Sequence, residues 1–178
     1  MKNIMRFIPL MVVIALVVLF VSMMGGDRNP QEIKSVLVGK EAPSFSLPAL
    51  AGGPVPLTEV DLKTGKPLLV NFFASWCLPC RAEHENLMRI AKEVGVPIIG
   101  ISYKDTPEKS LRFLDELGDP FLKTASDLDG RVAIDWGVTG VPESFLLDGN
   151  GIVRYRHWGP IVGDSLEKRL LPKLKEIS

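Results

Sequence analysis

Two cysteines separated by two residues are the most reactive pair of side chains in this 178-residue sequence. Cys77 and Cys80 are its only cysteines, and they lie in the stretch "NFFASWCLPCRAEH", residues 71–84. A pair with this spacing can bind a metal, attach haem, cross-link the fold or exchange electrons with another thiol. The neighbouring residues, and the elements that hold the pair, decide between these possibilities.

Metal, haem and purely structural roles each lack a necessary feature. A structural zinc site requires four ligands, but His84 is the only histidine at a helical spacing from the cysteines, and His157 is distant in the sequence. Haem attachment requires histidine directly after the second cysteine, where this chain has Arg81. A disulfide that closes so short a loop removes little unfolded-chain entropy. We therefore expect no metal and no other cofactor, with copper binding by the thiolates and His84 as an alternative.

Redox exchange fits the position of the pair. The apolar run "PLLVNFFA", Pro67–Ala74, predicts a strand buried on both faces, and Arg81–Val94 predicts a helix. Cys77 would then meet the free N–H groups of the first helical turn, which stabilise a thiolate. We predict that Cys77 is the attacking sulfur and that Cys80 is the resolving sulfur.

Two neighbours of the cysteines are expected to support this chemistry. Pro79 is tolerated in the first turn of a helix, where its missing N–H costs little. Trp76 can shield the pair and offer an apolar contact to a partner chain. A buried tryptophan without a redox role is the alternative interpretation.

The remaining elements predict an α/β fold with a mixed central sheet flanked by helices. Alternating strands and helices indicate a parallel central pair, and "DGNG" between two late strands predicts a hairpin. The last helix has an expected break near Pro172. The other expected strands are Phe45–Leu47, Val55–Leu57, Pro97–Ser102, Ser144–Leu147 and Ile152–Trp158, and the other expected helices are Thr106–Leu117, Asp129–Trp136 and Ser165–Ile177.

The N-terminal residues predict a membrane anchor. Phe7–Met24 is an apolar run of 18 residues, which as a helix would cover roughly 27 Å of a hydrocarbon core about 30 Å thick. Lys2 and Arg6 precede it and favour a cytoplasmic N-terminus. We expect residues 1–24 to be an uncleaved signal-anchor, 25–37 a linker and 38–178 one domain outside the cytoplasm. Lys plus Arg equals Asp plus Glu at 21 each, so no nucleic-acid partner is expected.

Two blocks of the sequence resemble a known family. "LVNFFASWCLPC" resembles the active-site strand and turn of thioredoxins, and "GVTGVPESFLLD" resembles their cis-proline loop, within a likeness that covers nearly all of residues 38–178. More narrowly, "CRAEH", "GVTGVPESFLLDGNGIVRYRHWGP" and the anchor resemble the envelope thioredoxins of cytochrome c maturation, the CcmG or DsbE group.

This resemblance implies a thioredoxin fold on the periplasmic side of the inner membrane. It implies a reductant that keeps the haem-binding cysteines of apocytochrome c reduced, directly or through a CcmH-like thiol protein. Its own electrons would come from a transmembrane thiol donor of the DsbD or CcdA kind. It also implies that Pro142 is cis and packs against the disulfide, with Val141 offering backbone groups to an extended substrate.

The resemblance also indicates which acidic residues act near the sulfurs. Asn71 stands where ordinary thioredoxins have a buried aspartate, and it cannot carry a proton. Glu83 and Glu143 match acidic positions of the CcmG group and are the candidate replacements. A negative charge close to the sulfurs would raise the pKa of the thiol and make the protein a better reductant. The alternative for each glutamate is a solvated surface carboxylate.

Other functions are alternatives to this one. "APSFSLPAL", residues 42–50, resembles the opening of peroxiredoxins, but the proline and threonine that their peroxide site needs are replaced here by Val70 and Ala74. Related anchored thioredoxins of oxidase assembly or sporulation share the fold and the dithiol and differ in their partner. A non-enzymatic copper carrier is the alternative from another class.

Overall fold

The chain divides into two units, Met1–Ile33 and Lys34–Ser178. The computed structural model describes residues 8–24 of the first and 35–177 of the second. Helix α1 spans Ile8–Met24, 17 residues without a charged side chain. Phe7, where the expected span begins, lies outside the described residues, as does most of the expected linker. Among the residues described, the length and the apolarity that a membrane crossing requires are not found together in any helix.

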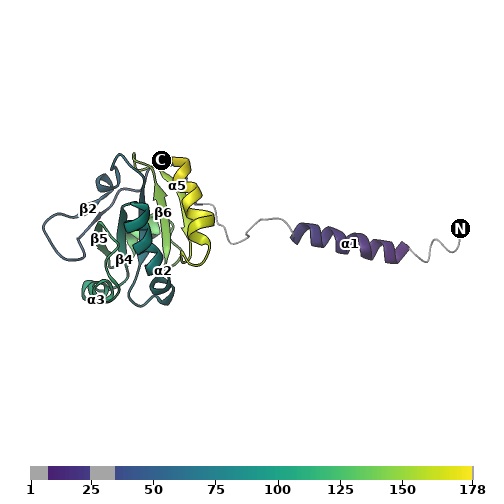
Figure 1. Cartoon of the computed structure of the whole chain (residues 1–178), viewed down its shortest axis with the longest axis horizontal. Helices are drawn as coiled ribbons and strands as arrows, with labels where there is room; N and C mark the ends of the chain where they lie inside the picture. The colour runs from purple at the N-terminus through teal and green to yellow at the C-terminus, as the bar shows by residue number, and fades with distance from the viewer. Residues whose placement is uncertain (1–7, 25–34, 178) are drawn as a thin grey trace. The chain divides into compact units, whose positions relative to one another are not determined.

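The second unit is built on a five-stranded mixed sheet with the strand order β5-β4-β3-β6-β7 (Figure 1). Strands β3, β4 and β5 are parallel, whereas β6 is antiparallel to both β3 and β7. The expected parallel pair and the expected hairpin are both confirmed. The strands are β3 (Leu68–Phe73), β4 (Ile98–Tyr103), β5 (Lys123–Asp127), β6 (Glu143–Leu147) and β7 (Val153–Trp158).

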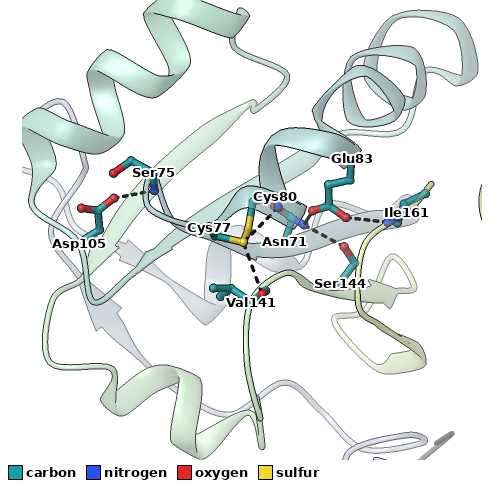
Figure 2. The surroundings of a disulfide bond; sticks show 9 residues. All are labelled: Asn71, Ser75, Cys77, Cys80, Glu83, Asp105, Val141, Ser144 and Ile161. Carbon is teal, nitrogen blue, oxygen red and sulfur yellow. Dashed lines mark hydrogen bonds between the residues drawn. A yellow bond between two sulfur atoms is a disulfide. The ribbon is translucent and has the colours of Figure 1, made fainter.

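Strand β3 lies in the middle of the sheet, and all six of its residues are buried. Its alternate side chains face two different cores: Leu69 packs with Leu87 on one face, and Val70 packs with Trp136 on the other. Because both faces are covered, the strand is almost entirely apolar. Asn71 is its one polar residue, and it points towards the face that carries the disulfide (Figure 2).

Helices cover both faces of this sheet, and α2 and α5 lie over the same face (Figure 1). All four expected helices are confirmed, but α2 begins at Leu78, three residues earlier than predicted. The last helix changes from π-helical to α-helical at Leu171, next to Pro172. The helices are α2 (Leu78–Arg89) continued by π-helical η3 (Ile90–Val94), α3 (Pro107–Leu117), α4 (Arg131–Asp135), and π-helical η4 (Leu166–Leu170) continued by α5 (Leu171–Ile177).

Edge strand β5 is missing from the expected elements, because its sequence "KTASD" has Thr124 as its one β-branched residue and no large apolar residue typical of strands. Its outer edge is covered by residues 48–50: the Leu50 N–H donates to the Thr124 carbonyl, and the Ser126 N–H donates to the Pro48 carbonyl, each at 3.0 Å. The two short strands expected before β3 are confirmed as an antiparallel pair. They are β1 (Ser46–Leu47) and β2 (Leu57–Thr58), and a 3-10 helix, η2 (Glu59–Leu62), follows them.

Candidate functional site

Cys77 and Cys80 form a disulfide where β3 passes into α2 (Figure 2). Cys77 is the N-cap residue of α2, and its Sγ accepts a hydrogen bond from the Cys80 N–H at 3.1 Å. An N–H group at a helix N-terminus, together with the helix dipole, stabilises a negative sulfur. The Cys77 sulfur, which is predicted to attack, therefore has an N–H donor of this kind. The attacking role of Cys77 and the resolving role of Cys80 stay predictions.

The residues beside the disulfide present apolar side chains to solvent. Trp76 is 59% exposed and Leu78 is 77% exposed. The alternative in which Trp76 is a buried core residue is therefore wrong. Pro79 is the second residue of α2, where its missing N–H breaks no intrahelical hydrogen bond. Trp76 and Leu78 are both accessible to a partner chain.

The loop before β6 lies against the disulfide. The peptide bond between Val141 and Pro142 is cis, as the resemblance implies. The Val141 carbonyl oxygen is 3.5 Å from the Cys77 Sγ, and Pro142 is buried (Figure 2). The predicted proximity of this loop to the cysteines is confirmed, and its use by an extended substrate stays a prediction.

Glu83 is fully buried in α2, one turn after Cys80, so the surface-carboxylate alternative is wrong for it. Its Oε1 accepts a hydrogen bond from Asn71 Nδ2 at 2.9 Å, and its Oε2 accepts one from the Ile161 N–H at 2.8 Å. Burial raises the pKa of the Glu83 carboxyl from 4.5 to about 7, against the lowering effect of these two hydrogen bonds. Glu83 is three residues after Cys80, so the two side chains lie on the same face of α2. The carboxyl on this face therefore changes its charge near neutral pH.

The two groups that hold Glu83 are uncharged donors. Asn71 Nδ2 also donates to Ser144 Oγ at 3.0 Å, so the asparagine joins α2 to strands β3 and β6. Ile161 is held at both of its backbone groups, because Asn86 Nδ2 donates to its carbonyl at 2.8 Å. The segment after β7 is thereby fixed against α2, and neither hydrogen-bond donor to Glu83 carries a charge that would balance the carboxylate.

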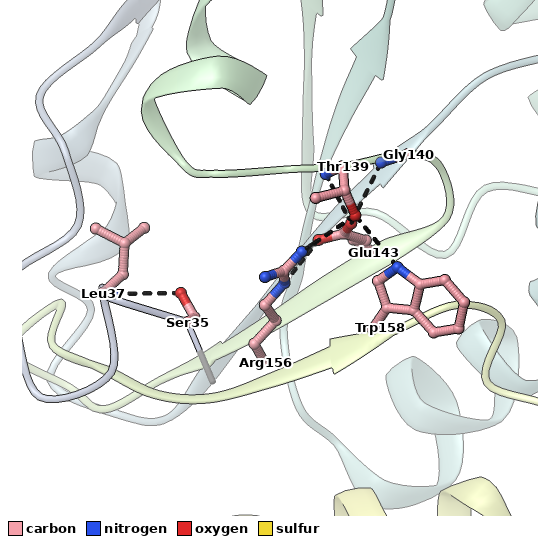
Figure 3. A network of polar contacts seen from close by, with 7 residues as sticks. All are labelled: Ser35, Leu37, Thr139, Gly140, Glu143, Arg156 and Trp158. Carbon is pink, nitrogen blue, oxygen red and sulfur yellow. Dashed lines mark hydrogen bonds and ion pairs between the residues drawn. The ribbon is translucent and has the colours of Figure 1, made fainter. Parts of the chain in front are cut away.

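Glu143 is also buried, beside cis Pro142, but its environment is different (Figure 3). Its Oε2 lies 2.7 Å from an Arg156 guanidinium nitrogen, and both side chains of this ion pair are buried. Its Oε1 accepts hydrogen bonds from the Thr139 N–H at 2.8 Å, the Thr139 hydroxyl at 2.7 Å and the Gly140 N–H at 3.3 Å. Arg156 balances the charge of Glu143, so this carboxylate is placed to hold the proline loop.

His84 contributes to packing on the other side of α2. Its Nε2 lies 2.8 Å from the Gly118 carbonyl oxygen, and its ring contacts Phe113 edge to face with centroids 5.2 Å apart. Burial lowers the pKa of the His84 imidazole. His84, which lies at a helical spacing from the cysteines, therefore has a hydrogen-bond partner in the backbone.

Three residues near the site were not predicted: Ser144, Arg156 and Asp105. Ser144 reaches Asn71 because the two residues lie opposite each other in the antiparallel pair of β3 and β6, and Arg156 reaches Glu143 through the antiparallel pair of β6 and β7. Asp105 accepts a hydrogen bond from the Ser75 N–H at 2.7 Å (Figure 2). The sequence did contain a signal for Asp105, because it follows a buried parallel strand, and functional groups of α/β proteins gather at the carboxyl ends of such strands.

Comparisons with known proteins agree with this geometry. Residues 37–170 match the family model described as Redoxin. The thiol:disulfide interchange protein HelX of Rhodobacter capsulatus is 43% identical over 83% of each chain. The thiol:disulfide interchange protein DsbE of Yersinia pestis is 38% identical over 98% of this chain and 94% of its own length. A crystal structure from Chlorobium tepidum, described as a DsbE thiol:disulfide interchange protein, matches with a TM-score of 0.62 at 33% identity. The match covers 77% of this chain and 97% of that one.

The family match spans three quarters of the chain, and it includes the disulfide, the buried glutamates and the cis-proline loop. The relatives named for thiol:disulfide interchange extend over most of the remaining residues. The chain is therefore a thiol-disulfide oxidoreductase with a thioredoxin-like α/β fold, and it belongs to the redoxin family.

Proposed function

We propose that this oxidoreductase is a membrane-anchored reductant of cytochrome c maturation. Through its Cys77/Cys80 dithiol it keeps the haem-binding cysteines of apocytochrome c reduced, either directly or by reducing a CcmH-like thiol protein. The observation that carries the reductive direction is Glu83, a buried carboxyl on the Cys80 side of α2 with no charged hydrogen-bond partner. The choice of pathway is supported by the DsbE and HelX relatives and by the sequence blocks that resemble the CcmG group.

The buried carboxyl favours reduction of the partner for an electrostatic reason. A charge on Glu83 opposes a second negative charge on the nearby sulfurs, which raises the pKa of the thiols and disfavours the thiolate form. One unit in a thiol pKa corresponds to about 1.4 kcal/mol, or about 30 mV for a two-electron couple. A less stable reduced form gives up its electrons more readily, so the couple becomes more reducing.

The proposed reaction is a pair of thiol–disulfide exchanges. The Cys77 thiolate attacks one sulfur of the partner disulfide, and the other partner sulfur leaves and takes up a proton. The Cys80 thiolate then attacks the Cys77 Sγ, which forms the Cys77–Cys80 disulfide and releases the second partner sulfur as a thiolate that takes up a proton from water. Two electrons pass to the partner. Glu83, with a pKa of about 7, is suited to accept the proton of Cys80 in the second step.

Residues 1–24 are proposed as the anchor, residues 25–37 as its linker and residues 38–178 as the periplasmic domain. Helix α1 has no charged residue, and at about 1.5 Å per residue its 17 residues cover about 26 Å. Ser22, a polar residue in this helix, donates its hydroxyl to the Val18 carbonyl at 3.0 Å, which satisfies it without water. Alkaline extraction of membranes should leave the full chain in the pellet and release a chain that lacks residues 1–24.

A transmembrane thiol donor of the DsbD or CcdA kind is proposed to return the disulfide to the dithiol. The exposed side chains of Trp76 and Leu78 beside the disulfide support docking of a partner chain at this surface. The same surface would serve the donor and the substrate in turn, because each must bring a sulfur atom to Cys77.

Two measurements test this function. A Cys80→Ser variant cannot resolve the mixed disulfide, so it should trap cytochrome precursors or their thiol partner, whereas Cys77→Ser should trap neither. The reduction potential of the Cys77/Cys80 couple should be close to that of reductants such as thioredoxin, about −270 mV. A potential near that of the oxidant DsbA, about −120 mV, would reverse the assigned direction.

A further inference from the structure

The loop between β4 and α3 is hydrogen-bonded to the segment that leads into Cys77. The Ser75 N–H donates to Asp105 Oδ2 at 2.7 Å, and Trp76 Nε1 donates to the Lys104 carbonyl at 3.2 Å. Two consecutive residues of this loop therefore bind the two consecutive residues that directly precede the attacking cysteine. Figure 2 shows the Ser75–Asp105 contact on one side of the disulfide and Glu83 on the other.

Asp105 is a buried carboxylate with several partners, all of them hydroxyl or backbone N–H groups. Its Oδ1 accepts from the Thr106 N–H at 3.0 Å, and its Oδ2 accepts from the Ser110 hydroxyl at 2.9 Å in addition to Ser75. The Ser110 hydroxyl also contacts Ser102 Oγ at 2.7 Å. A buried carboxylate is costly unless such donors surround it, so its position in this loop is closely defined.

Lys104 has an unusual backbone that places its carbonyl in this arrangement. Its φ is 47°, and among the described residues it is the one non-glycine with a positive φ. A side chain in the left-handed region costs conformational energy, and residues held there cluster at functional sites. The loop thus adopts an unfavourable backbone while it binds the Trp76 indole.

These contacts extend to the Cys77 sulfur through a short turn. The Cys77 N–H donates to the Ala74 carbonyl at 3.2 Å, so Ser75 and Trp76 are the two central residues of that turn. After the turn, Cys77 caps the N-terminus of α2 and places its sulfur 3.1 Å from the Cys80 N–H. A displaced Ser75 would change the direction in which the turn delivers Cys77 to the helix.

We infer that Asp105 is a positioning residue for thiol–disulfide exchange: by binding the Ser75 N–H it keeps the Cys77 sulfur over the N-terminus of α2. The inference depends on the exchange chemistry at Cys77 and not on the cytochrome c pathway proposed above. Asp105 acts through Ser75 and the turn, and no contact with the substrate is required.

Two other roles for Asp105 make different predictions. If Asp105 acted by its negative charge, it would oppose the thiolate, and removing the charge would lower the pKa of the Cys77 thiol. If Asp105 only stabilised the start of α3, removing another hydrogen bond of the same network would change the pKa of the Cys77 thiol by the same amount. Positioning predicts that loss of the Asp105 contact raises the pKa of the Cys77 thiol, because the sulfur moves away from the Cys80 N–H.

The test compares Asp105→Ala with Ser110→Ala in the full chain, reduced and held in detergent micelles. The rate of Cys77 alkylation by iodoacetamide is measured against pH to obtain the thiol pKa. Asp105→Ala removes both acceptor oxygens, whereas asparagine would keep one for the Ser75 N–H, and it should raise this pKa by about one unit, a tenfold loss of thiolate at a pH below it. Ser110→Ala removes another donor from the same carboxylate oxygen but leaves the Ser75 contact, so it should leave the pKa of Cys77 unchanged.

A second variant keeps the charge while it moves the carboxylate. Asp105→Glu should also raise the pKa of Cys77, and it serves as the test if Asp105→Ala does not fold by circular dichroism. Trp76→Phe removes the companion hydrogen bond, and its effect should be non-additive with Asp105→Ala. A lower pKa in Asp105→Ala, an unchanged pKa in the Asp105 variants, or equal shifts in Asp105→Ala and Ser110→Ala would each overturn the inference. The Cys80→Ser trap would still report on the pathway separately.

Discussion

The burial of Glu83 predicts how the stability of the protein changes with pH. Its pKa is about 7 in the folded chain and 4.5 in its usual environment. Below pH 4.5 the carboxyl is protonated in both the folded and the unfolded states. As the pH rises from there towards 7, the unfolded chain releases this proton while the folded chain keeps it, so the free energy of unfolding falls.

The size of the effect follows from the same interval. At about 1.4 kcal/mol per pH unit, the interval from 4.5 to about 7 amounts to about 3 kcal/mol of stability lost by pH 7. Glu83→Gln removes this loss because glutamine does not titrate. It also adds a constant cost of about 1–3 kcal/mol, since glutamine has one acceptor oxygen for the two donors Asn71 Nδ2 and the Ile161 N–H. The prediction therefore concerns the slope with pH and not the absolute stability.

Urea denaturation of the oxidised chain between about pH 4 and about pH 8 measures this slope. The difference in unfolding free energy between Glu83→Gln and the unmodified protein should rise by about 3 kcal/mol, in favour of the variant, across this range. Glu85→Gln is the matched control, because Glu85 is exposed in the same helix, and its curve should stay parallel to the unmodified one. Parallel curves for Glu83→Gln as well would refute the raised pKa and with it the electrostatic argument for reduction.

Three further outcomes are expected. Glu83→Gln should lower the pKa of the Cys77 thiol and raise the reduction potential of the Cys77/Cys80 couple. Glu143→Gln should change the pKa and the potential less, because Arg156 already balances the charge of Glu143. Alkylation rates against pH measure the pKa, and equilibration with glutathione measures the potential. Arg156→Met should cost about 3–5 kcal/mol in urea denaturation, and adding Glu143→Gln should recover part of that loss. Exposed Leu78 and buried Leu87 should differ when each is replaced by alanine: Leu78→Ala should change the free energy of unfolding by less than about 0.5 kcal/mol, and Leu87→Ala should lower it by about 2–5 kcal/mol. In the Cys80→Ser background, Leu78→Ala should weaken partner trapping while the protein stays folded, and Leu87→Ala should not.

The fold was predictable wherever burial imposes a pattern on the sequence. Strand β3 is apolar because the sheet covers it on both faces, and α3 is marked by Thr106 and Pro107 at its start and by Gly118 at its end. Strand β5 carries no such pattern, because it lies at an edge and pairs with residues 48–50 through backbone groups alone. Hydrogen bonds of the main chain leave little trace in residue types, so this strand could not be predicted.

The candidate site was predictable where its residues are neighbours in the sequence. Cys77 and Cys80 are three residues apart in the sequence, whereas Glu83, Pro142 and Glu143 were predicted from the resemblance to thioredoxins and the CcmG group. The contacts of Asp105 and Arg156 depend on how the strands are ordered and registered, and the sequence does not specify these. The sequence therefore names the reactive groups, and for Asp105 it indicates a place at the end of a buried strand but not the contact with Ser75.

The uncharged surroundings of Glu83 have a consequence for its neighbour in α2. Because the asparagine amide and the Ile161 N–H supply no positive charge, we expect the ionisations of Glu83 and Cys80 in the reduced protein to oppose one another. Such linkage is reciprocal: each ionisation would make the other less favourable by the same free energy. We therefore expect a carboxyl without exposed surface to make the sulfur chemistry sensitive to the pH around the protein.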